Sequence, residues 1–264
     1  QLLSPIAKKN NKEIKNNIIS IIKNSNSDLI IFAENNYPYI IDTIDLSNLT
    51  SLIKKDKNVI IGATTTKNEK YFNSFILLED KNIHFFEKQI LVPFGEFLPF
   101  RKYLNFFEVI SGNVDFHTGN KERFILTKDK LSLFPIICYE VIFDNIFNGI
   151  DKNKIDIIIN ITNDSWFGNK IGPYQHFYIS RVKSLISNKP FIRVSNNGIS
   201  AIIDNNGKIL KYSKLNKKTN IKYNLKVRSK NSYIYFHKVF HYYLIIFFII
   251  FFIISIRSDN EGRL

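Results

Sequence analysis

The sequence contains no methionine and only one cysteine, Cys138, among its 264 residues. Without a methionine, residue 1 is not a natural start, and we expect the sequence to be a piece of a longer chain. A single cysteine excludes an internal disulfide. Three roles remain for the Cys138 thiol: a small buried side chain, a partner for a cysteine of another chain, or a nucleophile. Taken alone, the cysteine favours the buried role, because free cysteine is among the most buried residue types.

Signatures of several ligands are also missing. The chain has no glycine-rich phosphate loop and no His/Cys cluster with metal-ligand spacing, so we expect no cofactor and no bound metal. The formal net charge of +14 would ordinarily suggest nucleic acid or an anionic membrane surface as a partner. The lysines, however, are scattered among asparagines and isoleucines along the whole chain, and no RNA- or DNA-binding motif accompanies them. We therefore expect no nucleic-acid partner.

One long apolar run stands near the C-terminal end, at residues 239–256 (VFHYYLIIFFIIFFIISI), which contain no Asp, Glu, Lys or Arg. As a helix this run would be roughly 27 Å long, enough to cross a bilayer. A buried core helix is the alternative, but the run is apolar on every face. We expect a transmembrane helix at 239–256, a polar connector at 211–238 and a short tail at 257–264.

Residues 1–210 alternate strand-like and helix-like patterns and predict one α/β or α+β domain. Helices are predicted over residues 10–24 and 174–187, the second with Phe177, Ile179, Val182, Leu185 and Ile186 as its apolar members. Strands are predicted at residues 28–33, 58–62, 74–78, 131–137 and 155–161. Residues 199–203 and 208–210 flank an Asn-Gly turn and predict a hairpin.

Three ionisable residues, Glu34, Lys88 and Cys138, stand at the ends of apolar runs. Individually, the glutamate and the lysine would be ordinary surface residues. Together the three can supply a cysteine acyl-transfer site, which needs a thiolate, a base and positive charge or N–H donors for the oxyanion. Burial would raise the pKa of Glu34 so that it acts as the base, and Lys88 would stabilise the oxyanion beside the backbone N–H of Tyr139.

The segments that carry these residues are residues 32–34 (FAE), 88–99 (KQILVPFGEFLP) and 137–140 (ICYE). In this order they resemble the Glu-Lys-Cys triad of the nitrilase, or carbon-nitrogen hydrolase, superfamily. Within it, residues 91–99 (LVPFGEFLP), 162–168 (TNDSWFG), 172–176 (GPYQH) and 193–199 (RVSNNGI) resemble the apolipoprotein N-acyltransferase branch. The resemblance runs from about Leu29 to Gly207.

This resemblance implies a nitrilase-like four-layer αββα sandwich over residues 1–210, followed by the transmembrane helix and preceded by membrane helices absent from the sequence. It implies transfer of a fatty acyl chain from a phospholipid to the N-terminal amine of a diacylglyceryl-cysteine apolipoprotein through a cysteine thioester. The implied location is the bacterial cytoplasmic (inner) membrane, with the catalytic domain on the outer, periplasmic face. Lysines are denser before residues 239–256 than after them, which would favour the opposite orientation, but large domains cross membranes largely irrespective of charge.

By the same resemblance, Cys138 is the nucleophile, Glu34 the general base and then acid, and Lys88 the oxyanion stabiliser. Glu96 would be a second carboxylate that positions Lys88 or the thiol; capping of nearby backbone N–H groups is its alternative role.

Three further residues are candidates for the substrate pocket. Tyr139 and Glu140 would line it, and Trp166 could face lipid or acyl chain, although a core position is at least as well supported by the sequence. Two departures from the family pattern are Ala33, where proline is common, and Ile90, where histidine is common.

Two other functions stay open. A membrane-tethered nitrilase-type amidase or hydrolase would use the same triad but let water resolve the thioester. A catalytically inactive, membrane-bound binding module is the third possibility, against which the intact Glu34, Lys88 and Cys138 argue.

Overall fold

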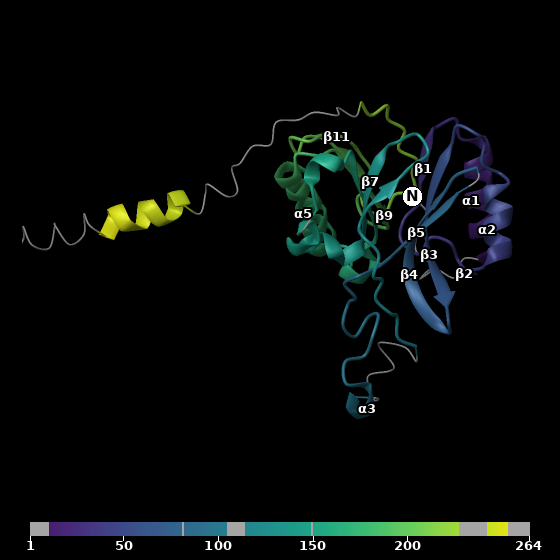
Figure 1. Ribbon diagram of the computed structural model, residues 1–264, viewed down its shortest axis with the longest axis horizontal. Helices are drawn as coiled ribbons and strands as arrows, with labels where there is room; N and C mark the ends of the chain where they lie inside the picture. Colours follow the sequence, from purple (N-terminus) through teal and green to yellow (C-terminus); the bar gives the residue numbers. More distant parts are fainter. Residues whose placement is uncertain (1–10, 81, 105–113, 149, 227–241, 253–264) are drawn as a thin grey trace, which may run out of the picture. The chain divides into compact units, whose positions relative to one another are not determined.

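The computed structural model describes residues 11–80, 82–104, 114–148, 150–226 and 242–252 (Figure 1). The chain divides into two compact units, residues 1–229 and 230–264. The first unit contains two β-sheets and the helices that cover them. The second contains a helix over residues 242–252.

The first sheet is built from the N-terminal third of the chain. Its strands lie in the order β1-β3-β4-β5, and β2 also pairs with β3. The pairings of β1 and β2 with β3 are parallel, whereas β3, β4 and β5 form an antiparallel meander. The bounds are β1 Leu29–Ile31, β2 Ile40–Ile41, β3 Asn58–Lys67, β4 Lys70–Leu78 and β5 Ile83–Glu87.

The second sheet has the order β11-β10-β9-β8-β7-β6. Its centre, β7-β8-β9, is parallel, and the outer pairs are antiparallel. The bounds are β6 Ile125–Leu126, β7 Ser132–Ile137, β8 Ile157–Asn163, β9 Phe191–Asn196, β10 Ala201–Ile203 and β11 Ile209–Tyr212. The predicted hairpin is confirmed as β10-β11, and Gly207 in its turn has a φ of 74°, a conformation that favours glycine.

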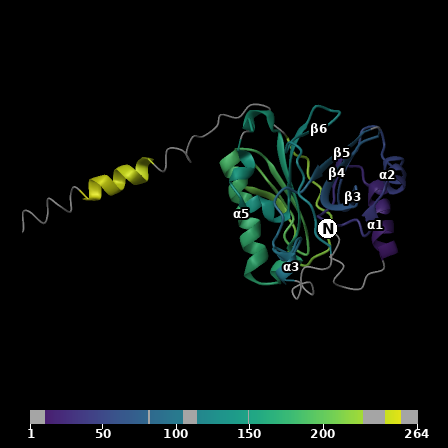
Figure 2. The ribbon, with the colours of Figure 1, turned by 60° about the horizontal axis from the view of Figure 1, so that its bottom comes forward.

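Helices cover the outer faces of the two sheets (Figures 1 and 2). Helices α1 (Asn11–Asn24) and α2 (Thr43–Thr50) pack on the first sheet, and α5 (Ile171–Ser187) packs on the second. A single-turn helix, α3 (Arg101–Leu104), lies in the long connection between β5 and β6. Short 3-10 helices follow several strands: η2 Cys138–Ile142, η3 Asn145–Phe147, η4 Lys152–Lys154 and η5 Asp164–Phe167.

Strand residues alternate between two apolar layers, as the two-residue period of a β-strand requires. On β3, Ile61 packs toward α1 and α2, whereas its neighbour Ile60 packs between the sheets. On β7, Phe134 packs toward α5 and Leu133 packs between the sheets. Three apolar layers therefore separate four structural layers, and the predicted αββα sandwich is confirmed.

Helix α5 differs from the sequence prediction. Phe177 is buried as expected, but Val182 and Leu185 are exposed, and the buried face instead carries polar side chains such as His176 and Ser180. The physical reason is that the second sheet presents a buried polar cluster to this helix, so polar side chains are needed on its inner face.

The predicted transmembrane segment lies only partly within the described residues. Residues 242–252 form a helix with exposed apolar side chains, whereas 239–241 and 253–256 fall outside. Among the described residues, no helix is both long enough and apolar enough to cross a membrane. The transmembrane helix therefore stays a prediction, as do the boundaries of the connector and the tail.

Candidate active site

Cys138 lies at a sharp turn between β7 and η2. All six residues of β7 are buried, and the backbone then turns at Cys138, whose φ is 53°. A left-handed conformation is uncommon for a residue other than glycine and marks local strain that the surrounding structure must hold. The residue is 5% exposed, so the turn holds a nearly buried thiol at the end of a central strand.

Glu34 lies beyond the end of β1, at the corresponding end of the first sheet. The chain passes here very close to Gly62 of β3. A Cβ atom at Gly62 would lie 2.4 Å from the carbonyl oxygen of Ala33 and 2.6 Å from the Cα of Glu34. Glycine at position 62 therefore permits the backbone path that carries the Glu34 side chain into the interior, where it is buried.

Lys88 follows β5 and brings two carboxylates together. Its Nζ lies 2.8 Å from each carboxylate oxygen of Glu96 and 3.6 Å from Glu34 Oε1. The loop carboxylate Glu96 is itself held by the backbone N–H of Val92, which donates to Oε2 at 2.9 Å. The structure therefore places Glu96 where it can fix the position of the lysine ammonium, and Glu96 also accepts a loop N–H.

Asn73 joins this group, although the sequence analysis did not identify it. Its Nδ2 donates to Glu34 Oε1 at 2.7 Å and to Glu96 Oε1 at 2.9 Å. The backbone carbonyl of Asn73 also accepts a hydrogen bond from the backbone N–H of Lys88 at 2.8 Å. Asn73 lies on β4, just before the strand predicted at residues 74–78, and a single neutral side chain at that position gave no signal in the sequence.

The electrostatics show that Glu34, Lys88 and Cys138 act on one another. Burial raises the pKa of Glu34 and the Glu96 charge adds to this, while Lys88 opposes it. Burial and the charge of Glu34 also raise the pKa of the Cys138 thiol to about 12. Burial by itself would lower the pKa of Lys88, but the surrounding carboxylates and the Cys138 thiolate outweigh it and raise that pKa.

These shifts define the resting state of the site. The thiol is protonated at neutral pH, the lysine is a fixed cation, and a buried carboxylate lies beside both. One oxygen of Glu34, Oε1, accepts from Asn73, while the other, Oε2, is buried without a hydrogen-bond partner among the described residues. A buried, unpartnered carboxylate oxygen is a suitable acceptor for a thiol proton, because burial raises its affinity for protons.

Glu140 is brought close to the turn but its carboxylate is fully engaged. Its oxygens accept from both terminal nitrogens of Arg123, at 2.7 and 2.9 Å, and from the backbone N–H groups of Gln89, Ile90 and Ile137. These bonds tie the chain after Lys88 to the strand before Cys138. The structure therefore supports a positional role for Glu140, and lining of a substrate pocket stays a prediction.

The two aromatic candidates have different surroundings. Tyr139 is half-buried against the layer between the sheets, with its ring edge-on to Phe143 at a centroid distance of 5.1 Å. Trp166, in η5, is 69% exposed. The core position considered for Trp166 is therefore wrong, because η5 leaves the sheet and presents this ring to solvent.

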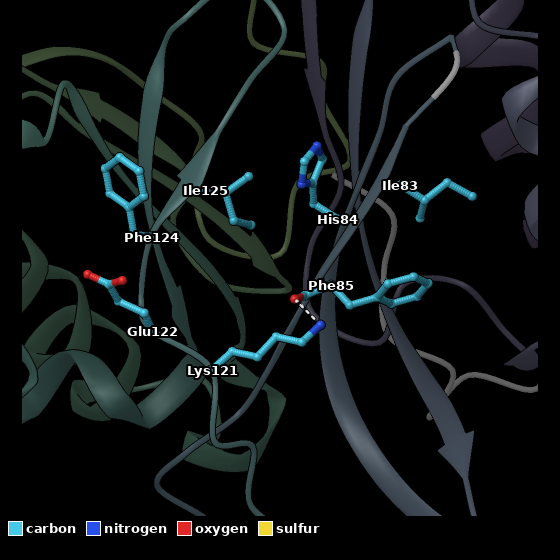
Figure 3. A pocket seen from close by; sticks show the side chains of 7 residues that line it. All are labelled: Ile83, His84, Phe85, Lys121, Glu122, Phe124 and Ile125. Carbon is cyan, nitrogen blue, oxygen red and sulfur yellow. Dashed lines mark hydrogen bonds between the residues drawn. The ribbon is translucent and has the colours of Figure 1, made fainter.

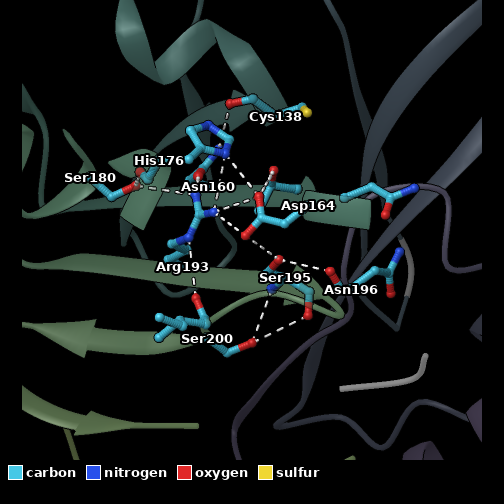
Figure 4. Close-up of polar contacts among 12 residues, drawn as sticks. Cys138, Asn160, Asp164, His176, Ser180, Arg193, Ser195, Asn196 and Ser200 are labelled. Carbon is cyan, nitrogen blue, oxygen red and sulfur yellow. Dashed lines mark hydrogen bonds and ion pairs between the residues drawn. The ribbon is translucent and has the colours of Figure 1, made fainter. Parts of the chain in front are cut away.

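A buried polar cluster lies next to the Cys138 turn, on the inner side of α5 (Figure 4). Arg193 and Asp164 form an ion pair at 2.6 Å, and His176 Nδ1 lies 2.8 Å from Asp164 Oδ1. Burial by itself would raise the pKa of Asp164, but Arg193 and His176 outweigh it and lower that pKa. Burial and then Arg193 lower the pKa of His176. The cluster is thus a carboxylate-guanidinium pair with a neutral imidazole.

A separate cavity of about 310 Å³ does not contain the triad (Figure 3). Lys121, one of the residues that line this cavity, donates from Nζ to the backbone carbonyl of Phe85 at 3.1 Å. Nothing connects this cavity with the chemistry of Cys138. Its lining residues are Ile83, His84, Phe85, Lys121, Glu122, Phe124 and Ile125.

The fold and the site together define a class of protein: an αββα sandwich in which a buried glutamate, lysine and cysteine meet where strands of both sheets end. The chain belongs to the carbon-nitrogen hydrolase family, whose model matches residues 5–229.

Among curated relatives, the apolipoprotein N-acyltransferase of Rickettsia typhi is 42% identical over 200 residues, which cover 72% of this chain and 40% of the relative. The chain spans about 40% of the length of the curated relatives that it matches.

Solved structures share the fold, and two of them show the extent of the likeness. A glutamine-dependent NAD+ synthetase from Acinetobacter baumannii aligns with a TM-score of 0.64 at 16% identity, over 83% of this chain and 43% of that chain. A carbon-nitrogen hydrolase from Helicobacter pylori G27 aligns with a TM-score of 0.61, also at 16% identity, over 83% of this chain and 84% of that one. At such low identity the likeness concerns the fold alone.

Proposed function

We propose that the protein is a membrane N-acyltransferase. It moves a fatty acyl chain from a phospholipid to the N-terminal amine of a diacylglyceryl-cysteine apolipoprotein, through a thioester on Cys138. The observation that carries this proposal is the buried meeting of Glu34, Lys88 and the Cys138 turn, in a chain 42% identical to a protein named apolipoprotein N-acyltransferase.

The first half-reaction forms the thioester. Glu34 Oε2 takes the thiol proton as the Cys138 sulfur attacks the carbonyl carbon of the phospholipid ester. The negative charge that develops on the ester oxygen lies near the Lys88 ammonium, which Glu96 keeps in place. The intermediate then collapses, the C–O bond breaks, and Glu34 returns its proton to the departing lysophospholipid oxygen.

The second half-reaction transfers the acyl group. The neutral N-terminal amine of the apolipoprotein attacks the thioester carbonyl, and Glu34 takes the proton that the amine loses. The C–S bond breaks, an amide forms, and the thiolate recovers the proton from Glu34. The high pKa of Cys138 favours this return to a neutral thiol. Each cycle therefore restores both the base and the nucleophile.

Exposed aromatic side chains in the connection that follows Lys88 and in η5 support a lipid substrate. Phe94, in the loop that carries Glu96, is exposed, as are Phe100 beyond it and Trp166 in η5. Large exposed aromatic rings are unfavourable in water and common where a protein meets lipid or an apolar chain. Trp166 is accordingly our candidate for contact with the acyl chain.

We further propose that the protein lies in the bacterial inner membrane with its catalytic domain on the periplasmic face. The apolar run at 239–256 supports a membrane location. Labelling of Cys138 in intact cells by a small membrane-impermeant thiol reagent is expected. Protection of a reactive Cys138 until lysis would contradict this orientation.

Acyl transfer to a lipopeptide amine by the full-length protein tests the proposal. Cys138→Ser is expected to abolish transfer while membrane expression is kept, because the hydroxyl is a much weaker nucleophile than a thiolate. Lys88→Met should also abolish it. Lys183→Met is the matched control, because it removes another buried lysine that lies outside the triad. This variant should keep acyl transfer per folded molecule. Release of ammonia from a small amide, without acyl transfer by the wild type, would favour the membrane-tethered amidase instead.

A further inference from the structure

Asn160 holds the backbone on both sides of the turn that carries the thiol. Its Nδ2 lies 3.3 Å from the carbonyl oxygen of Ile136 and 3.3 Å from that of Cys138 (Figure 4). The side chain is buried on β8, directly beside Ile136 in the parallel pairing with β7. One amide group therefore bridges the residues over which the backbone enters the left-handed conformation.

Asn196 makes the corresponding contact with the other sheet. This buried residue ends β9, and its Nδ2 donates to the backbone carbonyl of Glu34 at 2.7 Å. Its Oδ1 accepts from Asn36 Nδ2 at 2.9 Å, so the orientation of the amide is fixed from both ends. An amide on the second sheet thus holds the backbone of a residue that belongs to the first.

Arg193 orients the first of these amides. Its NH1 donates to Asn160 Oδ1 at 2.8 Å, while its NH2 pairs with Asp164. A guanidinium can only donate hydrogen bonds, so it must face the oxygen of the Asn160 amide. The Nδ2 group is then forced to face the two carbonyls of the turn.

The two amides belong to one connected network. Ser195 Oγ donates to Asp164 Oδ2 at 2.9 Å, and Ser195 directly precedes Asn196 at the end of β9. Gly198 lies against the same carboxylate: a Cβ there would come within 1.8 Å of Asp164 Oδ2. The Asp164 carboxylate therefore has little room to shift, and hydrogen bonds together with the Ser195–Asn196 peptide connect the Cys138 turn with the Glu34 backbone.

We propose that Asn160, Arg193 and Asn196 are positioning residues that set the separation between the Cys138 thiol and the Glu34 carboxylate. The thiol and the carboxylate come from different sheets, so the pairing of neighbouring strands alone does not fix their distance. The polar network does, because it anchors the backbone of each residue to the same ion pair. The inference rests on the proposed function only in that Cys138 and Glu34 react together.

The competing explanation is that these residues merely stabilise the fold. Asn58 provides the matched control, because it is also a buried asparagine. It lies at the start of β3 and pairs with Leu29, the first residue of β1, whereas Glu34 lies beyond the last residue of β1. The variants to compare are therefore Asn160→Ala, Asn196→Ala and Asn58→Ala in the full-length protein. All measurements are expressed per folded molecule, from the unfolding transition of each variant.

Two rates are measured: alkylation of Cys138 by iodoacetamide against pH, and single-turnover acylation of Cys138 by phospholipid. Asn160→Ala and Asn196→Ala are expected to shift the alkylation pH profile and slow acylation about 100-fold, as a displacement of about 1 Å can do. Arg193→Lys, which keeps the charge but loses the forked geometry, should act in the same way. Asn58→Ala should lower stability and leave both rates unchanged.

The proposal is overturned if Asn160→Ala and Asn196→Ala behave like Asn58→Ala, with lower stability but an unchanged pH profile and acylation rate. If an alanine variant does not fold, Asn160→Ser and Asn196→Ser keep a shorter donor and are measured identically. A wild type that is alkylated but never acylated would refute the proposed function. The alkylation profiles of the variants would still decide whether these residues position the thiol.

Discussion

The ammonium of Lys88 lies 2.8 Å from each carboxylate oxygen of Glu96, and the lysine side chain is only 1% exposed. A buried cation requires a charged partner in direct contact, because desolvation of an isolated charge is costly. Glu96 meets this requirement and leaves Glu34, 3.6 Å away, without a direct hydrogen bond to the ammonium. Glu34 can therefore exchange protons while the lysine stays charged.

Glu34→Gln is expected to stabilise the protein at pH 7 while abolishing acyl transfer. The pKa of Glu34 is raised by burial in the folded state. Its contribution to stability is then fully present below about pH 4.3, its unfolded pKa, and is lost as pH rises through the folded value. At pH 7 the buried, charged carboxylate therefore destabilises the fold, and a neutral glutamine removes this effect. A gain of about 1–2 kcal/mol in the free energy of unfolding is expected. Thermal unfolding measures it.

The same variant should also lower the pKa of the Cys138 thiol, because the Glu34 charge is one of the causes that raise it. Alkylation rates against pH would report this. Glu79→Gln, at a buried glutamate directly after the last residue of β4, is the control and should leave the pKa of the thiol unchanged. A higher thiol pKa in Glu34→Gln would show that the two groups do not interact as the structure has them.

Glu96→Gln and Asn73→Ala should move the pH dependence of acylation in opposite directions. The charge of Glu96 raises the pKa of Glu34, whereas the hydrogen bond from Asn73 lowers it. A general base must be deprotonated, so the rate rises with pH through the Glu34 pKa. The rising limb should therefore move to lower pH in Glu96→Gln and to higher pH in Asn73→Ala. Single-turnover acylation rates test this, and shifts of the same sign would contradict it.

Glu140→Gln should destabilise the protein by about 3–5 kcal/mol, because it leaves the buried Arg123 guanidinium without its carboxylate. Urea denaturation measures the loss. The replacement also weakens the bonds to the chain after Lys88, so activity per folded molecule should fall as well. A variant with wild-type stability would mean that Glu140 faces a pocket rather than Arg123.

Acid should weaken the fold through Asp164. Its pKa is lowered in the folded state, chiefly by Arg193 against the effect of burial. An aspartate with a depressed folded pKa contributes stability that is present above its unfolded pKa, about 3.9, and lost as pH falls through the folded value. The stability difference between wild type and Asp164→Asn should therefore be largest near neutral pH and shrink below about pH 4. Urea titrations at several pH values measure it, and a constant difference would contradict the ion pair.

The alternation of strands and helices was predictable from the sequence because its signals are local, whereas the four-layer arrangement was predicted from the resemblance to a known family. Glu34, Lys88 and Cys138 each follow or flank an apolar run, Glu34 and Lys88 beyond strands of the first sheet and Cys138 beyond β7 of the second. The resemblance to a known family then placed the three in one site. Burial patterns on β3 and β7 follow directly from the alternation of their residues.

Other features depend on contacts between distant segments, which no local pattern contains. Asn73 gains its role only when β4 lies beside the loop of Glu96. The polar inner face of α5 is explained by Asp164 and Arg193, which come from other elements. Trp166 could be core or surface by composition, and only the direction of η5 decides for the surface.

The central claim is that Cys138 carries the acyl group. Mass spectrometry of the full-length wild-type protein incubated with a phospholipid of defined chain length tests it most directly. The expected result is one acyl mass on the peptide that contains Cys138, sensitive to hydroxylamine as a thioester is, and absent from Cys138→Ser. An unmodified Cys138 in protein that nevertheless acylates a lipopeptide amine, or an acyl mass on another residue, would contradict the account.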